Sequence, residues 1–182
     1  MSSFLYKVVA SVDSVSLITT PQIVFIGKSN VGKSSLINAL LKRKLAYSSK
    51  TPGKTRAINL FKTEQEFLLV DVPGYGYAKR SKDERQIWEN IVDLFLRTNV
   101  SSIKLVFLLI DCRHELKEID IQAIHYIKSM NLNNIVILTK SDKKMHSGLR
   151  ETLESSYTME TIAYGKYTKN TQIYSIINKY MS

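Results

Sequence analysis

Eight residues near the amino terminus follow the pattern G-x-x-x-x-G-K-S, which is typical of a phosphate-binding loop. In such a loop, successive backbone N–H groups point inward at a triphosphate. We expect the Lys33 ammonium to reach the β- and γ-phosphate oxygens and the Ser34 hydroxyl to bind Mg²⁺. The residues of the loop are Gly27, Lys28, Ser29, Asn30, Val31, Gly32, Lys33 and Ser34.

The flanking elements fit this chemistry. An apolar run over residues 22–26 predicts a buried strand before the loop, and a helix is expected over residues 32–45 after it. The positive end of that helix dipole would face the phosphates. A surface turn rich in Gly, Ser and Lys can match the pattern by accident, but the strand before and the helix after disfavour that alternative.

A second candidate motif, Asp71-Val72-Pro73-Gly74, follows another apolar run. An acidic residue at a strand end beside a phosphate loop can hold a water of the Mg²⁺ shell. The glycine allows its own N–H to meet the γ-phosphate. Alone this motif is weak evidence, because Asp-x-Pro-Gly is also an ordinary turn.

A third motif, Thr139-Lys140-Ser141-Asp142, follows the strand expected over residues 134–139. The Asp142 carboxylate accepts hydrogen bonds only, which matches the N1–H and 2-amino donors of guanine but not the N1 acceptor of adenine. The Lys140 stem can lie along the base. Three such motifs in this order predict a site for GTP and GDP.

The composition indicates one domain over residues 1–182, with 44% hydrophobic and 23% charged residues. No apolar stretch approaches the roughly 18 residues of a membrane span, and nothing at the amino terminus indicates secretion. The single cysteine, Cys112, suits a reducing compartment and is expected to be a buried strand-end residue. We therefore expect a cytoplasmic protein without membrane contact, and a monomer.

The net charge of +10 is concentrated in one stretch. Between Ser14 and Thr63 there is no acidic residue, and a nucleotide does not require so many cations. A polyanionic partner such as RNA is the natural inference, although a solvated face that only aids solubility is the alternative. The basic residues of the stretch are Lys28, Lys33, Lys42, Arg43, Lys44, Lys50, Lys54, Arg56 and Lys62.

The alternation of apolar runs with helical patterns predicts an α/β fold, with a mostly parallel sheet covered by helices on both faces. Only two residues separate the second and third strands, so these should form an antiparallel hairpin. Further helices are expected over residues 81–97, 119–130 and 173–180. The strands are expected over residues 22–26, 57–63, 66–70, 104–111, 134–139 and 160–163.

Beyond these motifs, the runs at residues 49–56, 71–79 and 111–114 complete a resemblance over nearly the whole chain. The sequence resembles the EngB (YihA/YsxC) family of bacterial Ras-like GTPases, which assist assembly of the large ribosomal subunit. The resemblance implies a P-loop GTPase fold, a ribosomal large subunit or precursor rRNA as partner, and a need in cell division and septation. It also implies that Thr55 joins Ser34 on Mg²⁺ and that a mobile loop wraps the nucleotide with Gly53, Lys54, Thr55, Arg56 and Ala57.

The sequence departs from the family in two places. The family closes its guanine site with a Ser-Ala or Ser-Ser pair after the last strand, and aligning on Thr161-Ile162 puts Ala163 and Tyr164 there, with Ile162 as a further candidate beside them. A backbone N–H of this loop can still meet the guanine O6. The segment between Asp142 and Ala163 is also short, so its helix should be truncated.

Ras-like enzymes place a water-orienting glutamine where this chain has Tyr75, so we expect a slow GTPase that relies on Mg²⁺, Lys33, Thr55 and the Gly74 backbone. In related GTPases that lack the glutamine, an asparagine at the position of Asn30 helps to hold K⁺. Arg113 and His114 are expected to be structural and distant from the phosphates.

Two other functions would also fit part of the sequence. A P-loop phosphotransferase or ATPase is disfavoured by Asp142 and by the absence of an acceptor-site lid. A basic RNA-binding module with a vestigial nucleotide site is disfavoured by the intact Lys33, Ser34, Thr55 and Asp71.

Overall fold

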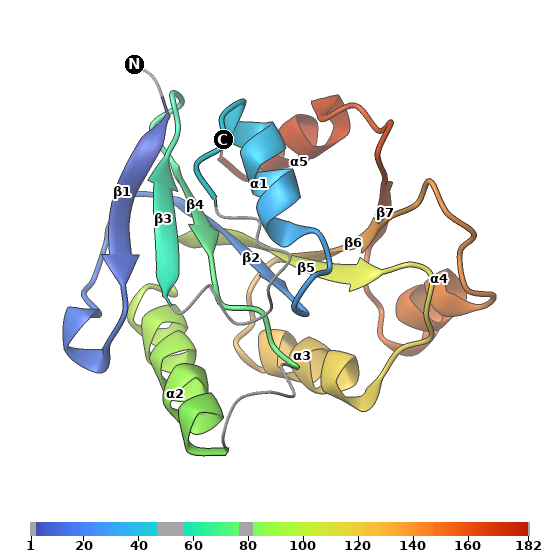
Figure 1. Cartoon of the computed structure of the whole chain (residues 1–182), viewed down its shortest axis with the longest axis horizontal. Helices are drawn as coiled ribbons and strands as arrows, with labels where there is room; N and C mark the ends of the chain where they lie inside the picture. The colour runs from blue at the N-terminus through green and yellow to red at the C-terminus, as the bar shows by residue number, and fades with distance from the viewer. Residues whose placement is uncertain (1–2, 47–56, 77–81, 182) are drawn as a thin grey trace.

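The computed structural model describes residues 3–46, 57–76 and 82–181 (Figure 1). A seven-stranded sheet forms its centre, with the strand order β1-β3-β4-β2-β5-β6-β7. The strands are β1 (Phe4–Val9), β2 (Gln22–Gly27), β3 (Ile58–Lys62), β4 (Leu68–Asp71), β5 (Ile103–Asp111), β6 (Asn134–Thr139) and β7 (Thr161–Tyr164). The helices are α1 (Lys33–Leu41), α2 (Lys82–Thr98), α3 (Glu118–Ser129), α4 (Leu149–Glu151) and α5 (Thr171–Met181), with a 3-10 turn at Val12–Ser14 and a π turn at Thr152–Ser156.

The pairing of the strands confirms the predicted mixed sheet. β2 pairs in parallel with both β4 and β5, and β5, β6 and β7 continue the parallel order. β3 and β4 form the predicted antiparallel hairpin. The parallel strands therefore bring their carboxyl ends to one edge, where the loops of an α/β fold usually bind ligands.

One strand was missing from the predicted set. β1 pairs antiparallel with β3 at the edge of the sheet, with a register shift between Leu5 and Lys7. The exposure of Phe4, Leu5, Tyr6 and Val8 removes the alternation of buried and exposed residues that would have marked a strand.

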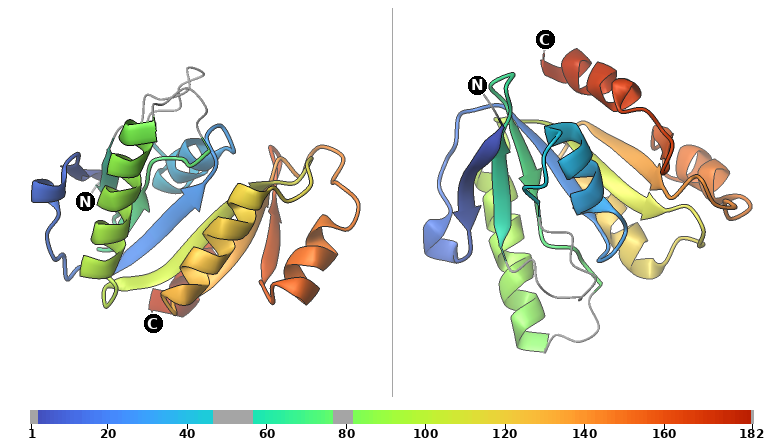
Figure 2. Two further views of the ribbon diagram at one scale, coloured as in Figure 1. Left: turned by 90° about the horizontal axis from the view of Figure 1, so that it is seen from below. Right: turned by 45° about the horizontal axis from the view of Figure 1, so that its top comes forward.

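The helices cover both faces of the sheet (Figure 2). On one face, Leu36 and Ile37 of α1 and Ile173 and Ile177 of α5 pack in a buried cluster with alternate strand residues such as Phe107. On the other face, Ile91 and Phe95 of α2 and Ile124 and Ile127 of α3 pack with the intervening strand residues, such as Leu108. This alternation explains why strands such as β5 read as continuous apolar runs.

Two predicted boundaries were wrong. α1 was expected to reach residue 45, but it ends at Leu41 because Lys42 takes a left-handed conformation with φ of +52°. The Asn38 side chain then holds the chain that turns back, accepting from the N–H groups of Leu45 and Ala46 at 2.8 and 2.7 Å. The third strand was expected from residue 66, but Glu66 has a φ of +66°, so β4 begins at Leu68.

The truncated helix predicted between Asp142 and Ala163 is confirmed, since α4 spans only three residues before the π turn. Among the helices of the described residues, none is long and apolar enough to cross a membrane.

Candidate functional site

The P-loop connects the end of β2 to the start of α1. Gly32 has a φ of +111° and immediately precedes α1, so Lys33 and Ser34 occupy the first helical turn. A Cβ on Gly27 would lie 2.9 Å from Val31 Cγ1 and 3.0 Å from the Leu109 carbonyl oxygen, which explains why a glycine stands there. The loop is thus folded tightly against β5. The backbone N–H groups that follow Gly32 lie at the start of α1.

Lys33 and Asp71 form a buried ion pair beneath this loop. Asp71 is the last residue of β4, and β4 pairs with β2 in parallel, so its carboxylate lies beside the loop that connects β2 to Lys33 at the start of α1. The contact brings the first and second predicted motifs into one site.

The chain after Asp71 lies directly against the P-loop. Ser29 N donates to the Tyr75 carbonyl over 3.1 Å, and Tyr75 N donates to the Gly27 carbonyl over 3.2 Å. A Cβ on Gly74 would come within 2.9 Å of Ser29 N. Only a glycine therefore permits this close approach of the two backbones.

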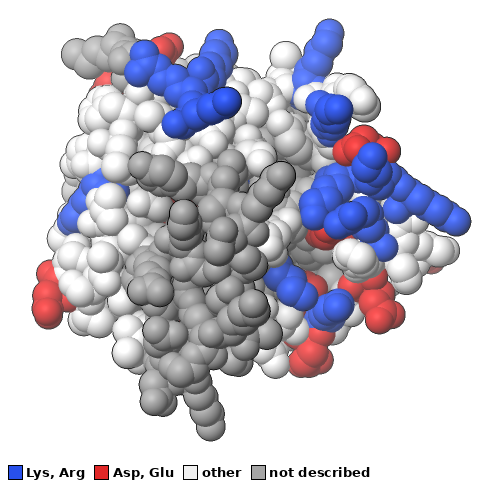
Figure 3. All heavy atoms as spheres, in the orientation of Figure 1, with Lys and Arg blue, Asp and Glu red and all other residues white. Residues whose placement is uncertain are grey.

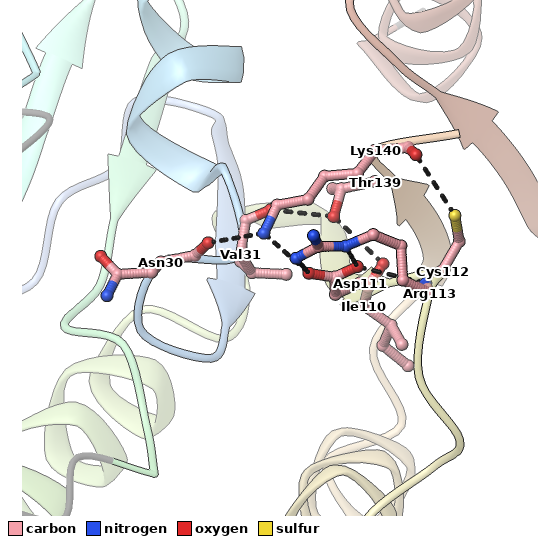
Figure 4. Close-up of polar contacts among 8 residues, drawn as sticks. All are labelled: Asn30, Val31, Ile110, Asp111, Cys112, Arg113, Thr139 and Lys140. Atoms are coloured by element: carbon pink, nitrogen blue, oxygen red, sulfur yellow. Dashed lines mark hydrogen bonds and ion pairs between the residues drawn. The ribbon is translucent and has the colours of Figure 1, made fainter. Parts of the chain in front are cut away.

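The third motif is joined to the P-loop by two side chains (Figure 4). Thr139 Oγ1 lies 2.8 Å from the Val31 carbonyl and donates to it. Lys140 Nζ donates to the Asn30 carbonyl over 3.1 Å. The phosphate loop and the predicted guanine loop are consequently held at a fixed spacing.

Asp111, at the end of β5, holds Lys140 from the other side (Figure 4). Its Oδ2 accepts from Lys140 Nζ over 2.7 Å, and Arg113 donates to both carboxylate oxygens at 2.9 and 2.8 Å. Burial raises the pKa of Asp111, but these hydrogen bonds outweigh it and hold the pKa well below its usual range. The carboxylate is therefore charged and orients the lysine.

The expectation that Arg113 lies far from the site was wrong. Arg113 and Lys140 bind the same carboxylate, that of Asp111. Arg113 and His114 also line a cavity of about 270 Å³ together with Asn30 and Lys140. Sequence reasoning missed Asp111 as a site residue, although its place at the end of a strand next to β2 was a signal. Cys112 is buried at this strand end, as expected.

Asp142 lies where the loops after β6 and β7 meet. Its Oδ1 accepts from Lys166 N over 3.1 Å and its Oδ2 is 3.4 Å from Lys143 Nζ. The Lys166 hydrogen bond, supported by Lys143, holds the pKa of Asp142 below its ordinary value. The carboxylate is thus an acceptor at neutral pH, which is the property the predicted guanine contact requires.

The residues that contact the predicted guanine loop lie slightly later in the chain than the alignment indicated. Ile162 is buried in the core cluster with α5, whereas the Tyr164 carbonyl accepts from Ser141 N over 3.2 Å. Beyond it, a Cβ on Gly165 would be 2.6 Å from Asp142 N. Gly165 and Lys166 therefore lie directly against the predicted guanine loop, a contact that sequence reasoning missed although the glycine after a strand was an available signal.

Comparisons with known proteins agree with this arrangement of motifs. A family model described as "50S ribosome-binding GTPase" matches residues 22–140. A probable GTP-binding protein EngB of Thermotoga petrophila is 45% identical over 147 residues, which cover 81% of this chain and 74% of the relative. A probable GTP-binding protein EngB of Thermotoga sp. (strain RQ2) is 41% identical over 170 residues, which cover 88% of this chain and 86% of the relative.

The chain belongs to the EngB family of GTP-binding proteins. A crystal structure of a probable GTP-binding protein EngB matches the fold with a TM-score of 0.74 and 24% identity, covering 87% of this chain and 97% of that one. As a member of the EngB family, the chain is a GTPase with the P-loop fold.

One part of the EngB site predicted from the sequence lies outside the described residues, namely Gly53, Lys54, Thr55 and Arg56. Ala57 is described and half-buried just before β3. The remaining candidate residues of the three motifs are all brought to one edge of the sheet.

The donor set of this EngB site fits Mg²⁺. Ser34 offers a hydroxyl and Asp71 a buried carboxylate, both hard oxygen donors of the kind Mg²⁺ prefers. Within the described ranges no group of three or more His, Cys, Asp or Glu side chains forms a metal site. These residues suit a Mg²⁺ ion whose coordination is completed by phosphate oxygens, rather than one held by protein ligands alone.

Proposed function

We propose that this EngB-family GTPase is a slow GTP-dependent switch that assists assembly of the large ribosomal subunit in the cytoplasm. The observation that carries the proposal is the joining of the guanine loop to the phosphate loop through Thr139 and Lys140. This joining makes base recognition and phosphate binding parts of one rigid site. The matching family model, described as a ribosome-binding GTPase, supports the choice of partner.

A basic surface follows the P-loop helix. Lys42, Arg43 and Lys44 are exposed directly after α1. Figure 3 shows basic side chains gathered at the top of one face, beside the end of α1, and again at the right beside β7 and α4. Exposed cations without acidic neighbours in sequence suit the phosphates of RNA.

In the proposed reaction, Lys33 leaves Asp71 for the β- and γ-phosphates, and Ser34, with Thr55, binds Mg²⁺. Bound Mg²⁺ neutralises the charge that develops on the phosphates. The Gly74 N–H meets the γ-phosphate, while Asp142 reads the guanine edge. Ile162 is buried in the core, so in this proposal the base pocket is lined from Ala163 and Tyr164 onward, with the backbone rather than a serine facing the guanine O6.

Slow hydrolysis follows from Tyr75. Its hydroxyl donates to Asp120 Oδ1 over 2.8 Å, and the side chain lacks the amide with which a glutamine orients the attacking water. We propose that the ribosomal particle supplies what the isolated chain lacks. K⁺ held by Asn30 is a second route: the Asn30 carbonyl accepts from Lys140, while its side chain points away from that lysine (Figure 4).

The test is co-sedimentation with 50S particles in GDP, in a non-hydrolysable GTP analogue and without nucleotide. Binding should be strongest with the analogue, and the particles should accelerate GTP hydrolysis. The variant Lys42→Glu/Arg43→Glu/Lys44→Glu should bind weakly. A matched control, Arg97→Glu/Lys104→Glu/Lys128→Glu, changes three exposed cations of α2, β5 and α3 and makes the same change in net charge.

Equal losses in both triple variants would indicate a general charge effect rather than a surface beside α1. Particle binding that is independent of nucleotide, together with no hydrolysis even on particles, would favour the alternative function, a basic RNA-binding module with a vestigial nucleotide site. A role in cell division is proposed only as a consequence of impaired ribosome assembly. It would be tested by septum spacing in cells depleted of the protein.

A further inference from the structure

The Tyr75 side chain connects the loop after β4 to the first turn of α3. Its hydroxyl donates to Asp120 Oδ1, while the backbone of the same residue pairs with Gly27 and Ser29 of the P-loop. One residue thus contacts the phosphate loop through its main chain and α3 through its side chain. No motif of the sequence required this second contact.

Asp120 is held in this position by burial and by a second hydrogen bond. It is 7% exposed, and its second oxygen accepts from Lys117 N over 3.2 Å at the start of α3. A buried carboxylate is costly unless both oxygens have partners, so the tyrosine hydroxyl satisfies a real requirement. Burial, with Asp120 adding to it, raises the pKa of Tyr75, so the hydroxyl remains a donor at any physiological pH.

The geometry limits where Gly74 can lie. On one side the Ser29 backbone lies against it, and on the other the next residue is tied to α3. A displacement of the Gly74 N–H away from Ser29 therefore acts on the Tyr75–Asp120 hydrogen bond and, through it, on α3.

We propose that Tyr75 and Asp120 are positioning residues that hold the Gly74 N–H in reach of the γ-phosphate and couple its position to α3. The inference rests on the proposed function, because it assigns Gly74 to the γ-phosphate. GDP lacks that phosphate, so the contact contributes to the affinity for GTP but not to the affinity for GDP. The pair therefore acts on the discrimination between the two nucleotides.

The test measures the affinities of a non-hydrolysable GTP analogue and of GDP by calorimetry. Tyr75→Phe removes only the hydroxyl, and we expect the ratio of analogue to GDP affinity to fall by at least about fivefold, the lower end of typical coupling between sites. Asp120→Ala should have the same effect, and the double variant should lose no more than either single one. Asp120→Asn keeps an acceptor and should restore most of the ratio.

The chain offers a matched control in Tyr126. Its hydroxyl also donates to an aspartate, Asp93 Oδ1, over 2.8 Å, but this bond joins α3 to α2 and does not involve the P-loop. Tyr126→Phe should lower the melting temperature about as much as Tyr75→Phe and leave the affinity ratio unchanged.

Two outcomes contradict the inference separately from the proposed function. If wild type binds both nucleotides and Tyr75→Phe leaves the ratio unchanged, the Tyr75–Asp120 bond is purely structural. The same conclusion follows if Tyr126→Phe changes the ratio equally. Failure of wild type to bind either guanine nucleotide would overturn the proposed function and this inference together.

Discussion

The Lys166 peptide N–H donates to Asp142 Oδ1 over 3.1 Å, which ties the loop after β7 to the carboxylate predicted to bind guanine. The bond occupies one lone pair of that oxygen and fixes the orientation of the side chain, which is 15% exposed. Asp142 is therefore preorganised by the backbone of a neighbouring loop. Its remaining acceptor capacity stays available to a ligand.

The first prediction concerns the base. A site built to hydrogen-bond a donor pair rejects an analogue that lacks it by about 10⁴-fold or more, so GTP and GDP should bind far better than ATP. Asp142→Asn should shift preference toward xanthine nucleotides, because an amide supplies the donor that xanthine requires. Calorimetry with GTP, GDP, ATP and a xanthine nucleotide checks this. Equal affinities of wild type for ATP and GTP would refute the assignment.

The second prediction concerns Gly165. A Cβ at this position would lie 2.6 Å from Asp142 N, so Gly165→Ala must push the loop after β7 away from the loop after β6. We expect the fold to be destabilised by about 1–3 kcal/mol, the usual cost of overpacking, and the affinity for GDP to fall because Asp142 is displaced. Gly148→Ala is the control, because Gly148 has a positive φ but no atom near its Cβ position. That control should lower the melting temperature while leaving GDP affinity intact.

The third prediction follows from the lowered pKa of Asp111. A carboxyl whose pKa is lower in the folded than in the unfolded protein stabilises the fold above its unfolded pKa of about 3.9. This stability disappears as the pH falls through that value toward the folded pKa. The difference in unfolding free energy between wild type and Asp111→Asn should therefore be constant from pH 5 to 7 and shrink below about pH 4. Urea titrations at each pH measure it, and a difference that grows in acid would contradict the argument.

The sequence predicted the parts of this fold that depend on local pattern. The two residues between β3 and β4 were enough to predict an antiparallel pair, and the apolar run before each motif located β2, β4 and β6. The end of α1 could not be predicted, since a lysine in a left-handed conformation carries no signal in its residue type. β1 was missed because its partner, β3, lies some fifty residues away and the exposed edge removes the alternation.

The candidate site shows the same division. Motif residues such as Lys33, Asp71 and Asp142 were found because their chemistry is tied to a short pattern. Two supporting residues were not found: Asp111, which binds Lys140, and Lys166, whose N–H binds Asp142. Each acts on a residue of another strand or loop, so its role appears only when the sheet brings the two together. Arg113 acts only through Asp111, two residues before it.

The fourth prediction concerns the rate. With the Tyr75 hydroxyl bonded to Asp120, turnover of the isolated protein should be slow, on the order of 10⁻⁴ s⁻¹ or modestly faster. If Asn30 holds K⁺, hydrolysis should be faster in K⁺ than in Na⁺, and Asn30→Ala should remove the difference. Phosphate release in matched chloride buffers measures it. Equal rates in the two salts for wild type would leave the ribosomal particle as the activator.

The last prediction concerns the charge of the basic surface beside α1. Each RNA phosphate that Lys42, Arg43 and Lys44 neutralise releases counterions, so the logarithm of the affinity for 50S particles should fall with the logarithm of salt concentration, with a slope of about −0.7 to −0.9 per contact. Reversing the three charges should flatten that slope and leave GTP affinity nearly unchanged, because none of the three belongs to a nucleotide motif. Binding measured at several KCl concentrations, with the GTP analogue and with GDP, gives both quantities. An unchanged slope in the reversed variant would mean that the particle does not contact these residues, and that the stretch without acidic residues is only a solvated face.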